Sequence, residues 1–183
     1  NGLSKTVDFT IAKAPLTVTA NPKTITYGEK LDNNGVTYSG FVKDEREDVL
    51  GGKLTYAYNY QQYGNVGSYE ITIDGLTSGN YDITFTTGTL TVERKSVTTQ
   101  GVAVASKVYD GTTVAAITHN GRLSANFDGV NLTFHVGTAA YDNKSAGEGK
   151  TVTFSGFSLE GSAAGNYRLT GQPGEVTASI APM

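Results

Sequence analysis

The sequence of 183 residues contains no cysteine and no tryptophan, and it has only one methionine and four prolines. Without cysteine, the chain has no disulfide, no thiolate zinc site and no thiol nucleophile. This absence does not fix the compartment in which the protein works, because small exported domains often use disulfides but do not all depend on them.

Charged residues and long apolar runs are also scarce. Charged side chains make up 17% of the chain, and the formal net charge is -3, spread over both halves. No basic face is present to attract phosphates, so nucleic acid is not an expected partner. No apolar run approaches the roughly 20 residues that cross a bilayer, so no membrane span is expected. The sequence starts in the middle of a pattern, and we interpret it as a piece of a longer protein.

Glycine, tyrosine, threonine and valine are abundant instead, with 23 glycines and 11 tyrosines. This composition is typical of many short strands joined by turns, and it differs from that of helices rich in Ala, Leu, Glu and Lys. The length allows one domain or two small ones.

Three sequence landmarks occur twice at nearly the same spacing. Gly-Asn-Tyr stands at 79–81 and again at 165–167, which is 86 residues later. The Tyr-Gly of "TITYGEKL" is followed, 82 residues on, by the Tyr-Asp-Gly of "SKVYDGTT". The stretch 8–19 also resembles the stretch 89–99, at an offset of 81. A shared period of this kind indicates internal repeats.

The period predicts two modules, at 13–94 and 95–183, preceded at 1–12 by the tail of another module. Each module contains runs such as "KLTYAYNY" and "VNLTFHVG", which place apolar residues at every second position. The expected fold is therefore all-β, with two tandem small antiparallel β-sandwich modules of the Ig-like kind. The alternative is a β-grasp-like module with one short helix, at 43–50.

Glycine-containing motifs mark the expected turns. In Gly-Asn-Tyr, we expect the glycine to supply a backbone conformation closed to other residues. The tyrosine then begins a strand, with its ring buried and its hydroxyl bonded to a backbone carbonyl. Three further pairs predict tight hairpin turns: Asn34-Gly35, Asn120-Gly121 and Asp128-Gly129. We interpret the repeated motifs as architectural, and their residues are Tyr27, Gly28, Gly79, Asn80, Tyr81, Tyr109, Asp110, Gly111, Gly165, Asn166 and Tyr167.

No group of residues predicts catalysis or a metal site. Neither histidine, His119 or His135, lies in a recognisable nucleophile motif, and His135 is expected to point to solvent. The acidic residues within 44–48 lack the alternating oxygens and central glycine of a calcium loop, so we expect a solvated loop or helical turn there. The segment 141–150 fits a long hairpin loop. No enzymatic activity and no cofactor are expected, and a Lys-Asn or Lys-Asp isopeptide crosslink is left open.

A row of tyrosines is the best candidate for ligand contact. Aromatic rings stack on sugars and anchor protein interfaces, so an exposed row suits a glycan or a protein ligand. Alternation favours the other interpretation, in which the row is the inward face of a strand together with Leu54. The candidate residues are Tyr56, Tyr58, Tyr60 and Tyr63.

Both modules resemble repeats of bacterial surface proteins. The first, with "ITYGEKL", "YSGFVKDE" and "VGSYEITIDGLTSGNYDITFTTGTLTV", resembles the MBG repeat in its Tyr-Gly variant. The second, with "SKVYDGTT" and "AYDNKSAGEGKTVTFSGFSLEGSAAGNYRLTG", resembles the YDG repeat of large adhesins and haemagglutinin-like exoproteins. The resemblance implies an extracellular, mostly-β module used in tandem arrays at the bacterial cell surface, with neighbouring repeats as its partners. It supplies no ligand and no catalytic residue.

Two functions from different classes follow. In the first, the modules are spacers that extend a distal binding region of an adhesin from the cell. In the second, the modules themselves bind a host glycan or protein. The junctions "TIAKAPLTV" and "TVERKSVTT" favour the first, because they join successive modules through few residues and contain no Gly/Ser run. Such junctions predict an elongated rod.

Overall fold

The computed structural model describes residues 7–125 and 131–183 of the chain, and these residues are almost entirely strands and loops. This confirms the all-β class. No α-helix occurs in either described range, and the two short helical turns are the 3₁₀ helices η1 (Glu47–Val49) and η2 (Ala164–Asn166). The stretch 43–50 therefore contributes one 3₁₀ turn, and the β-grasp alternative is not favoured. The expected turn at Asp128-Gly129 lies outside the described residues.

The chain divides into two compact units. The first unit contains the described residues up to Ile25 together with Glu29–Gln62 and Gly67–Val92. The second contains Thr26–Gly28, Tyr63–Val66 and Glu93–Met183.

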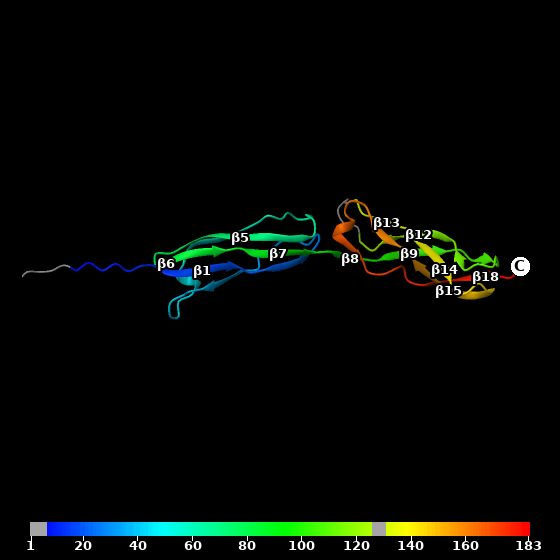
Figure 1. Ribbon diagram of the computed structural model, residues 1–183, viewed down its shortest axis with the longest axis horizontal. Coiled ribbons are helices and arrows are strands. Elements are labelled where there is room, and N and C mark those ends of the chain that lie inside the picture. Colours follow the sequence, from blue (N-terminus) through cyan, green and yellow to red (C-terminus); the bar gives the residue numbers. More distant parts are fainter. Residues whose placement is uncertain (1–6, 126–130) are drawn as a thin grey trace, which may run out of the picture. The chain divides into compact units, whose positions relative to one another are not determined.

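Seven strands belong wholly or mainly to the first unit, and they form two sheets. One sheet has the order β3-β1-β6, and the other has the order β2-β7-β5-β4. Figure 1 shows β1, β5, β6 and β7 extending along one common direction. The strands are β1 (Ala14–Ala20), β2 (Lys23–Thr26), β3 (Val36–Ser39), β4 (Gly51–Tyr58), β5 (Gly67–Thr77), β6 (Tyr81–Thr86) and β7 (Gly88–Glu93).

Hydrophobic alternation builds the core of this unit, as the sequence predicts. Every second residue of β1 from Leu16 to Ala20 is buried, and so are Ile71 and Ile73 of β5. The backbone also passes from one sheet to the other between β6 and β7. A Cβ atom on Gly88 would lie 2.5 Å from the Ala20 carbonyl oxygen, so this crossing requires glycine.

The second unit is built from shorter strands. Its largest sheet has the order β10-β18-β15-β14-β11, and three strand pairs, β12-β9, β13-β16 and β17-β8, complete it. The strands are β8 (Lys95–Val97), β9 (Thr99–Val104), β10 (Lys107–Val108), β11 (Val114–Ala115), β12 (Ile117–Leu123), β13 (Thr133–His135), β14 (Thr138–Tyr141), β15 (Gly147–Ser155), β16 (Ser158–Glu160), β17 (Tyr167–Leu169) and β18 (Val176–Ala181). Its core is an apolar cluster that includes Tyr141, Val152, Phe154 and Ile180.

The two units share a strand pattern. In the first, β1 pairs in parallel with β6, and Ala14 lies opposite Tyr81. In the second, β8 pairs in parallel with β17, and Lys95 lies opposite Tyr167. The order β2-β7-β5-β4 also matches β10-β18-β15-β14 strand for strand. The sheets are therefore mixed, not purely antiparallel as expected, because the strand that opens each unit pairs in parallel with a strand near its end.

Two expectations about turns are wrong. Neither Gly79 nor Gly165 has a positive φ, and no atom would lie within 4 Å of a Cβ atom on either, so their backbone is not closed to other residues. The pair Asn120-Gly121 lies inside strand β12, which has an irregular register against β9. Gly121 has a φ of +77° there and lies in the regularly paired part of the strand, so its positive φ does not mark a hairpin turn.

The tyrosines of the two Gly-Asn-Tyr copies should each be essential to stability. Both rings are 2% exposed, so Tyr81→Ala or Tyr167→Ala should lower the free energy of unfolding of its unit by about 3 kcal/mol or more. Tyr109→Ala is the control: its ring is 37% exposed, and we expect a loss of about 0.5 kcal/mol or less. Urea denaturation followed by NMR signals from each unit measures these changes. Unchanged midpoints for both core variants would contradict the architectural role.

Candidate functional site

The candidate tyrosine row does not form one surface. Tyr56 and Tyr58 are half-buried, Tyr60 is buried, and Tyr60 packs against Tyr69 with ring centroids 4.8 Å apart. Burial, and to a lesser extent Tyr56, raises the pKa of the Tyr58 hydroxyl. Tyr63 is 41% exposed but belongs to the second unit. The structure therefore places Tyr56 and Tyr58 along the partly covered face of β4, and Tyr60, just beyond the end of that strand, in the core.

The two histidines have different neighbours. His119 Nδ1 is 2.9 Å from the Gly101 carbonyl oxygen and 3.0 Å from the Gly121 nitrogen, so its neighbours are backbone atoms. His135 is solvent-exposed, and its Nδ1 is 3.7 Å from a Glu160 carboxylate oxygen. Within 7–125 and 131–183, no group of three or more His, Cys, Asp or Glu residues is placed to hold a metal ion.

The acidic loop of the first unit has a structural partner. The Tyr81 hydroxyl donates a hydrogen bond to a Glu45 carboxylate oxygen and accepts one from the Val42 N–H at 2.9 Å. The bond to Glu45 raises the pKa of Tyr81. The expected bond to a backbone carbonyl is therefore wrong for Tyr81. Its hydroxyl instead ties the loop after β3 to the start of β6.

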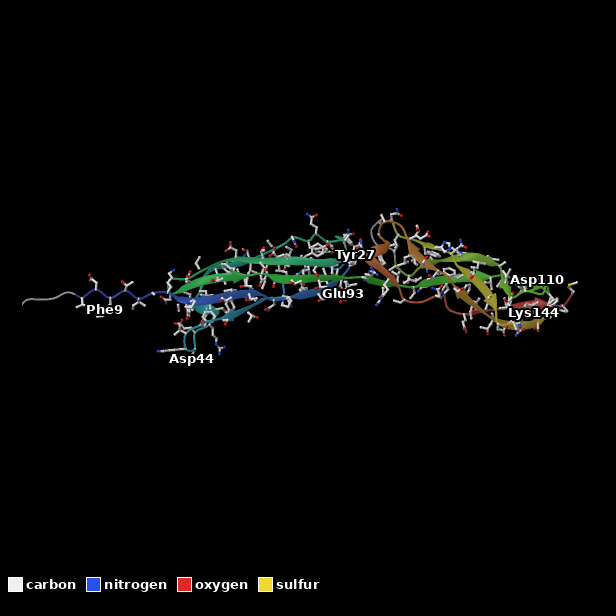
Figure 2. All side chains as sticks on the ribbon, in the orientation of Figure 1. Phe9, Tyr27, Asp44, Glu93, Asp110 and Lys144 are labelled. Atoms are coloured by element: carbon white, nitrogen blue, oxygen red, sulfur yellow. The ribbon has the colours of Figure 1, made fainter. Side chains whose placement is uncertain are left out.

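A hollow of about 420 Å³ opens beside this tyrosine. Its walls include Ile11, Ala12, Glu45, Asn80 and Tyr81. The Lys13 ammonium, which also lines the hollow, donates to the Ser78 carbonyl oxygen at 2.8 Å. Figure 2 shows Phe9 on the extended segment that leads to β1, where 88% of its side chain is exposed. The lining thus combines apolar side chains with the amide of Asn80, the carboxylate of Glu45 and the ammonium of Lys13.

The Tyr-Asp-Gly motif forms a turn around one lysine. Lys107 Nζ donates to Asp110 Oδ1 at 2.8 Å, to the Thr112 carbonyl and hydroxyl oxygens at 3.0 Å, and to the Val114 carbonyl at 2.9 Å. It also lies 5.5 Å from the centre of the Tyr141 ring. Gly111 has a φ of +78°, which few other residues adopt. The motif is therefore a closed structural turn.

The two tyrosine motifs upstream of Gly-Asn-Tyr are not equivalent in burial, since Tyr27 is buried and Tyr109 is exposed. Sequence reasoning also missed a core tyrosine. Tyr141 is buried, and its hydroxyl donates to the carbonyl oxygens of Ala105 at 2.9 Å and Ser179 at 3.3 Å. The expected hairpin loop at 141–150 included Tyr141, whereas the structure places Tyr141 at the end of strand β14 (Thr138–Tyr141), in which buried residues alternate.

Two lysine–aspartate pairs bear on the crosslink that the sequence left open. Lys23 and Asp32 form an ion pair, and Lys150 Nζ lies 3.0 Å from Asp142 Oδ1. Both aspartate side chains are solvent-exposed, so each pair has the setting of a surface ion pair.

The second Gly-Asn-Tyr copy forms a filled recognition site within the second unit, which we call the Asn166–Tyr167 site. Asn166 Oδ1 accepts a hydrogen bond from the Val66 N–H at 2.9 Å, and Asn166 Nδ2 donates to Asn65 Oδ1 at 3.0 Å. The Tyr167 ring meets the Tyr27 ring edge to face, with centroids 5.2 Å apart. The Asn166 amide thus hydrogen-bonds to the loop at residues 65–66, while the Tyr167 ring packs against the Tyr27 ring.

A backbone bond anchors that aromatic ring. The Tyr27 N–H donates to the Glu93 carbonyl oxygen at 2.8 Å, and Figure 2 labels both residues. Tyr63 also packs against Tyr27, with centroids 6.3 Å apart. Segments 26–28 and 63–66 are thereby held within the second unit.

Comparison with family models confirms both resemblances. Residues 16–91 match the MBG domain (YGX type), and residues 93–174 match the YDG domain. Searches of the curated proteins and of the solved structures gave no significant match. Within the described ranges, no helix is both long and apolar enough to cross a membrane.

The Lys107 turn should make the second unit sensitive to acid. The pKa of Asp110 is lowered from 3.8 to about 2, chiefly because Lys107 donates to its carboxylate, with further bonds from Thr112. Since the folded pKa is the lower one, the stabilisation is complete above pH 3.8 and is lost as the pH falls through about 2. A carboxyl ¹³C titration should therefore give Asp110 a midpoint near 2.

Asp110→Asn is the matching variant, and it should flatten the pH dependence of second-unit stability between pH 4 and pH 2. Asp82→Asn, in the first unit, is the control and should leave that dependence unchanged. An Asp110 midpoint close to 3.8 would contradict the assigned bonds.

Proposed function

We propose that this tandem of an MBG domain (YGX type) and a YDG domain is a non-catalytic spacer segment of a bacterial surface adhesin, exported to the cell exterior. Its task is to extend a distal binding region from the cell. The two families support a repeat module of the adhesin type, and the spacer role is the step that we add.

The observation that carries this proposal is the length of the junction. Strand β7 ends at Glu93 and β8 begins at Lys95, so a single residue, Arg94, separates the last strand of one domain match from the first strand of the next. A flexible linker needs many residues, commonly glycine and serine. A one-residue link leaves few backbone torsions for bending, and stiffness is the property that a spacer requires.

The chemistry of the side chains agrees with a passive role. The ionisable groups with lowered pKa values, Asp110 and Asp142, each sit in a turn with a lysine that neutralises them. Perturbed groups at catalytic sites usually face a cleft instead, where a substrate can reach them. Glycan or protein binding by the modules is the competing function, and the half-buried tyrosines of β4 give it little exposed ring surface.

Small-angle scattering of the 183-residue chain tests the spacer role. A single compact globule of this length has a radius of gyration of about 16 Å. A stiff, extended spacer should give a distinctly larger value that stays the same between low and high salt. A value near 16 Å would overturn the proposal.

The matched control replaces Arg94 with a run of ten Gly/Ser residues. If the one-residue junction limits bending, this variant should show a broader distribution of dimensions than the natural chain, with unchanged strand content by circular dichroism. Submillimolar glycan binding by the natural chain would reassign the function to direct adhesion.

A further inference from the structure

The first Gly-Asn-Tyr copy has the same strand position as the second but lacks its contacts. Tyr81 lies opposite the first residue of β1, as Tyr167 lies opposite the first residue of β8. Asn166 is buried with both ends of its amide bonded, whereas Asn80 is exposed and its side chain bonds to none of the described residues. Asn166 therefore hydrogen-bonds to a loop in the second unit, whereas the side-chain amide of Asn80 makes no such bond to the described residues of the first.

The hollow beside Asn80 corresponds to the place that is filled at the Asn166–Tyr167 site. Tyr81, Ile11 and Ala12 are among the residues that line it. By the repeat offset of 81, Ala12 corresponds to Glu93. The Glu93 carbonyl accepts the N–H of Tyr27, which is the residue that rests on Tyr167. Of the segments around the filled site, the equivalent of the strand that ends at Glu93 is thus present at the hollow, whereas the Tyr-Gly turn and the loop that it holds have no counterpart there among the described residues.

The segment in front of the hollow also lacks its packing partners. Phe9 and Ile11 are 88% and 96% exposed, although they alternate like the residues of a strand. Their counterparts at the same offset are Leu90 and Val92, which are buried in the sheet of β7. Large apolar side chains in a regular alternating pattern gain stability only when a sheet covers them.

We propose that the surface formed by Asn80, Tyr81 and the wall at residues 11–12, which we call the Asn80–Tyr81 site, binds the end of a further MBG-type module. That module is N-terminal in the same polypeptide, and residues 7–12 are its last strand. It presents a Tyr-Gly turn and an Asn-Val loop, as residues 26–28 and 65–66 do in the second unit. The inference rests on the proposed function in that both place modules in series.

The chemistry of recognition follows from the filled site. The Asn80 amide has one acceptor and one donor group, which match a loop N–H and a second side-chain amide. Phe41 already packs edge to face against Tyr81, with centroids 5.4 Å apart, so part of that ring is covered from within the first unit. Binding of the further module therefore depends on hydrogen bonds to the Asn80 amide and on apolar side chains that cover Ile11.

A tandem protein tests the proposal: residues 1–94 followed directly by residues 14–183. The second copy of the first unit then follows residues 88–94 of the first copy, which take the place of 7–13. The readout is hydrogen exchange at the Val66 N–H of the first copy. We expect protection of this amide, and Asn80→Ala in the second copy should reduce it roughly tenfold, in line with the loss of two hydrogen bonds.

Three matched measurements complete the test. In the 183-residue chain, Asn166→Ala should reduce protection of the Val66 amide to a similar extent, because the bond already exists there. Asn80→Ala in that same chain should leave exchange in the first unit unchanged, since its side chain is exposed. Thr84→Ala in the second copy of the tandem should also have no effect at Val66.

Several results would overturn the proposal. The first is fast hydrogen exchange at the Val66 N–H of the first copy. The second is protection of that amide that Asn80→Ala in the second copy does not reduce. The third is association of tandem proteins with one another in place of docking within one chain. A first copy less stable than the first unit of the natural chain would also overturn it, because docking adds contacts. These outcomes are distinguishable from failure of the spacer role, because small-angle scattering tests that role through the dimensions of the chain, whereas hydrogen exchange tests the docking through one hydrogen bond.

Discussion

Both units depend on the parallel pairing of their opening strand with a strand near their end. β1 pairs with β6, and β8 pairs with β17, in each case from the Gly-Asn-Tyr tyrosine onward. This pairing joins residues more than 60 positions apart, so the loops between must close before it forms. A buried tyrosine at the first paired position offsets the entropy cost of closing that loop, because its ring makes a large apolar contact. The repeated motif marks the residue at which the closing ladder begins.

Much of the fold is visible in the sequence because strand alternation is a local signal. The period of two in β4, β5 and β7 identifies their inward faces, and the repeat offsets locate two modules. Parallel pairing was not predicted, because nothing local distinguishes a strand that pairs with its neighbour from one that pairs across the module. Gly121 is a related case: a glycine with positive φ occurs inside a strand as well as at a hairpin turn, and the Asn-Gly dipeptide alone does not distinguish the two.

The contacts of the candidate site could be predicted from the sequence even less than the strand pairing. The motifs around Tyr27, Tyr81 and Tyr167 predict buried aromatic side chains. The residues that these tyrosines contact, however, come from other segments of the chain. Glu45 reads as a solvated acid in sequence, and only the fold brings it to the Tyr81 hydroxyl. Lys107 likewise gives no sequence signal of its role, because three of its four hydrogen bonds go to the motif's threonine and to a backbone carbonyl. Such roles are set by three-dimensional proximity.

The parallel strand pairs have a mechanical consequence. A pull on the two ends of one unit acts backward on β1 and forward on the continuous run of β6 and β7, along the strand axis. The hydrogen bonds between β1 and β6 then lie across the direction of sliding and bear the load together, whereas a hairpin pulled at its open end would lose its bonds one at a time. The parallel pair of β8 and β17 places the same geometry in the second unit. Each unit is therefore arranged to resist tension along the chain.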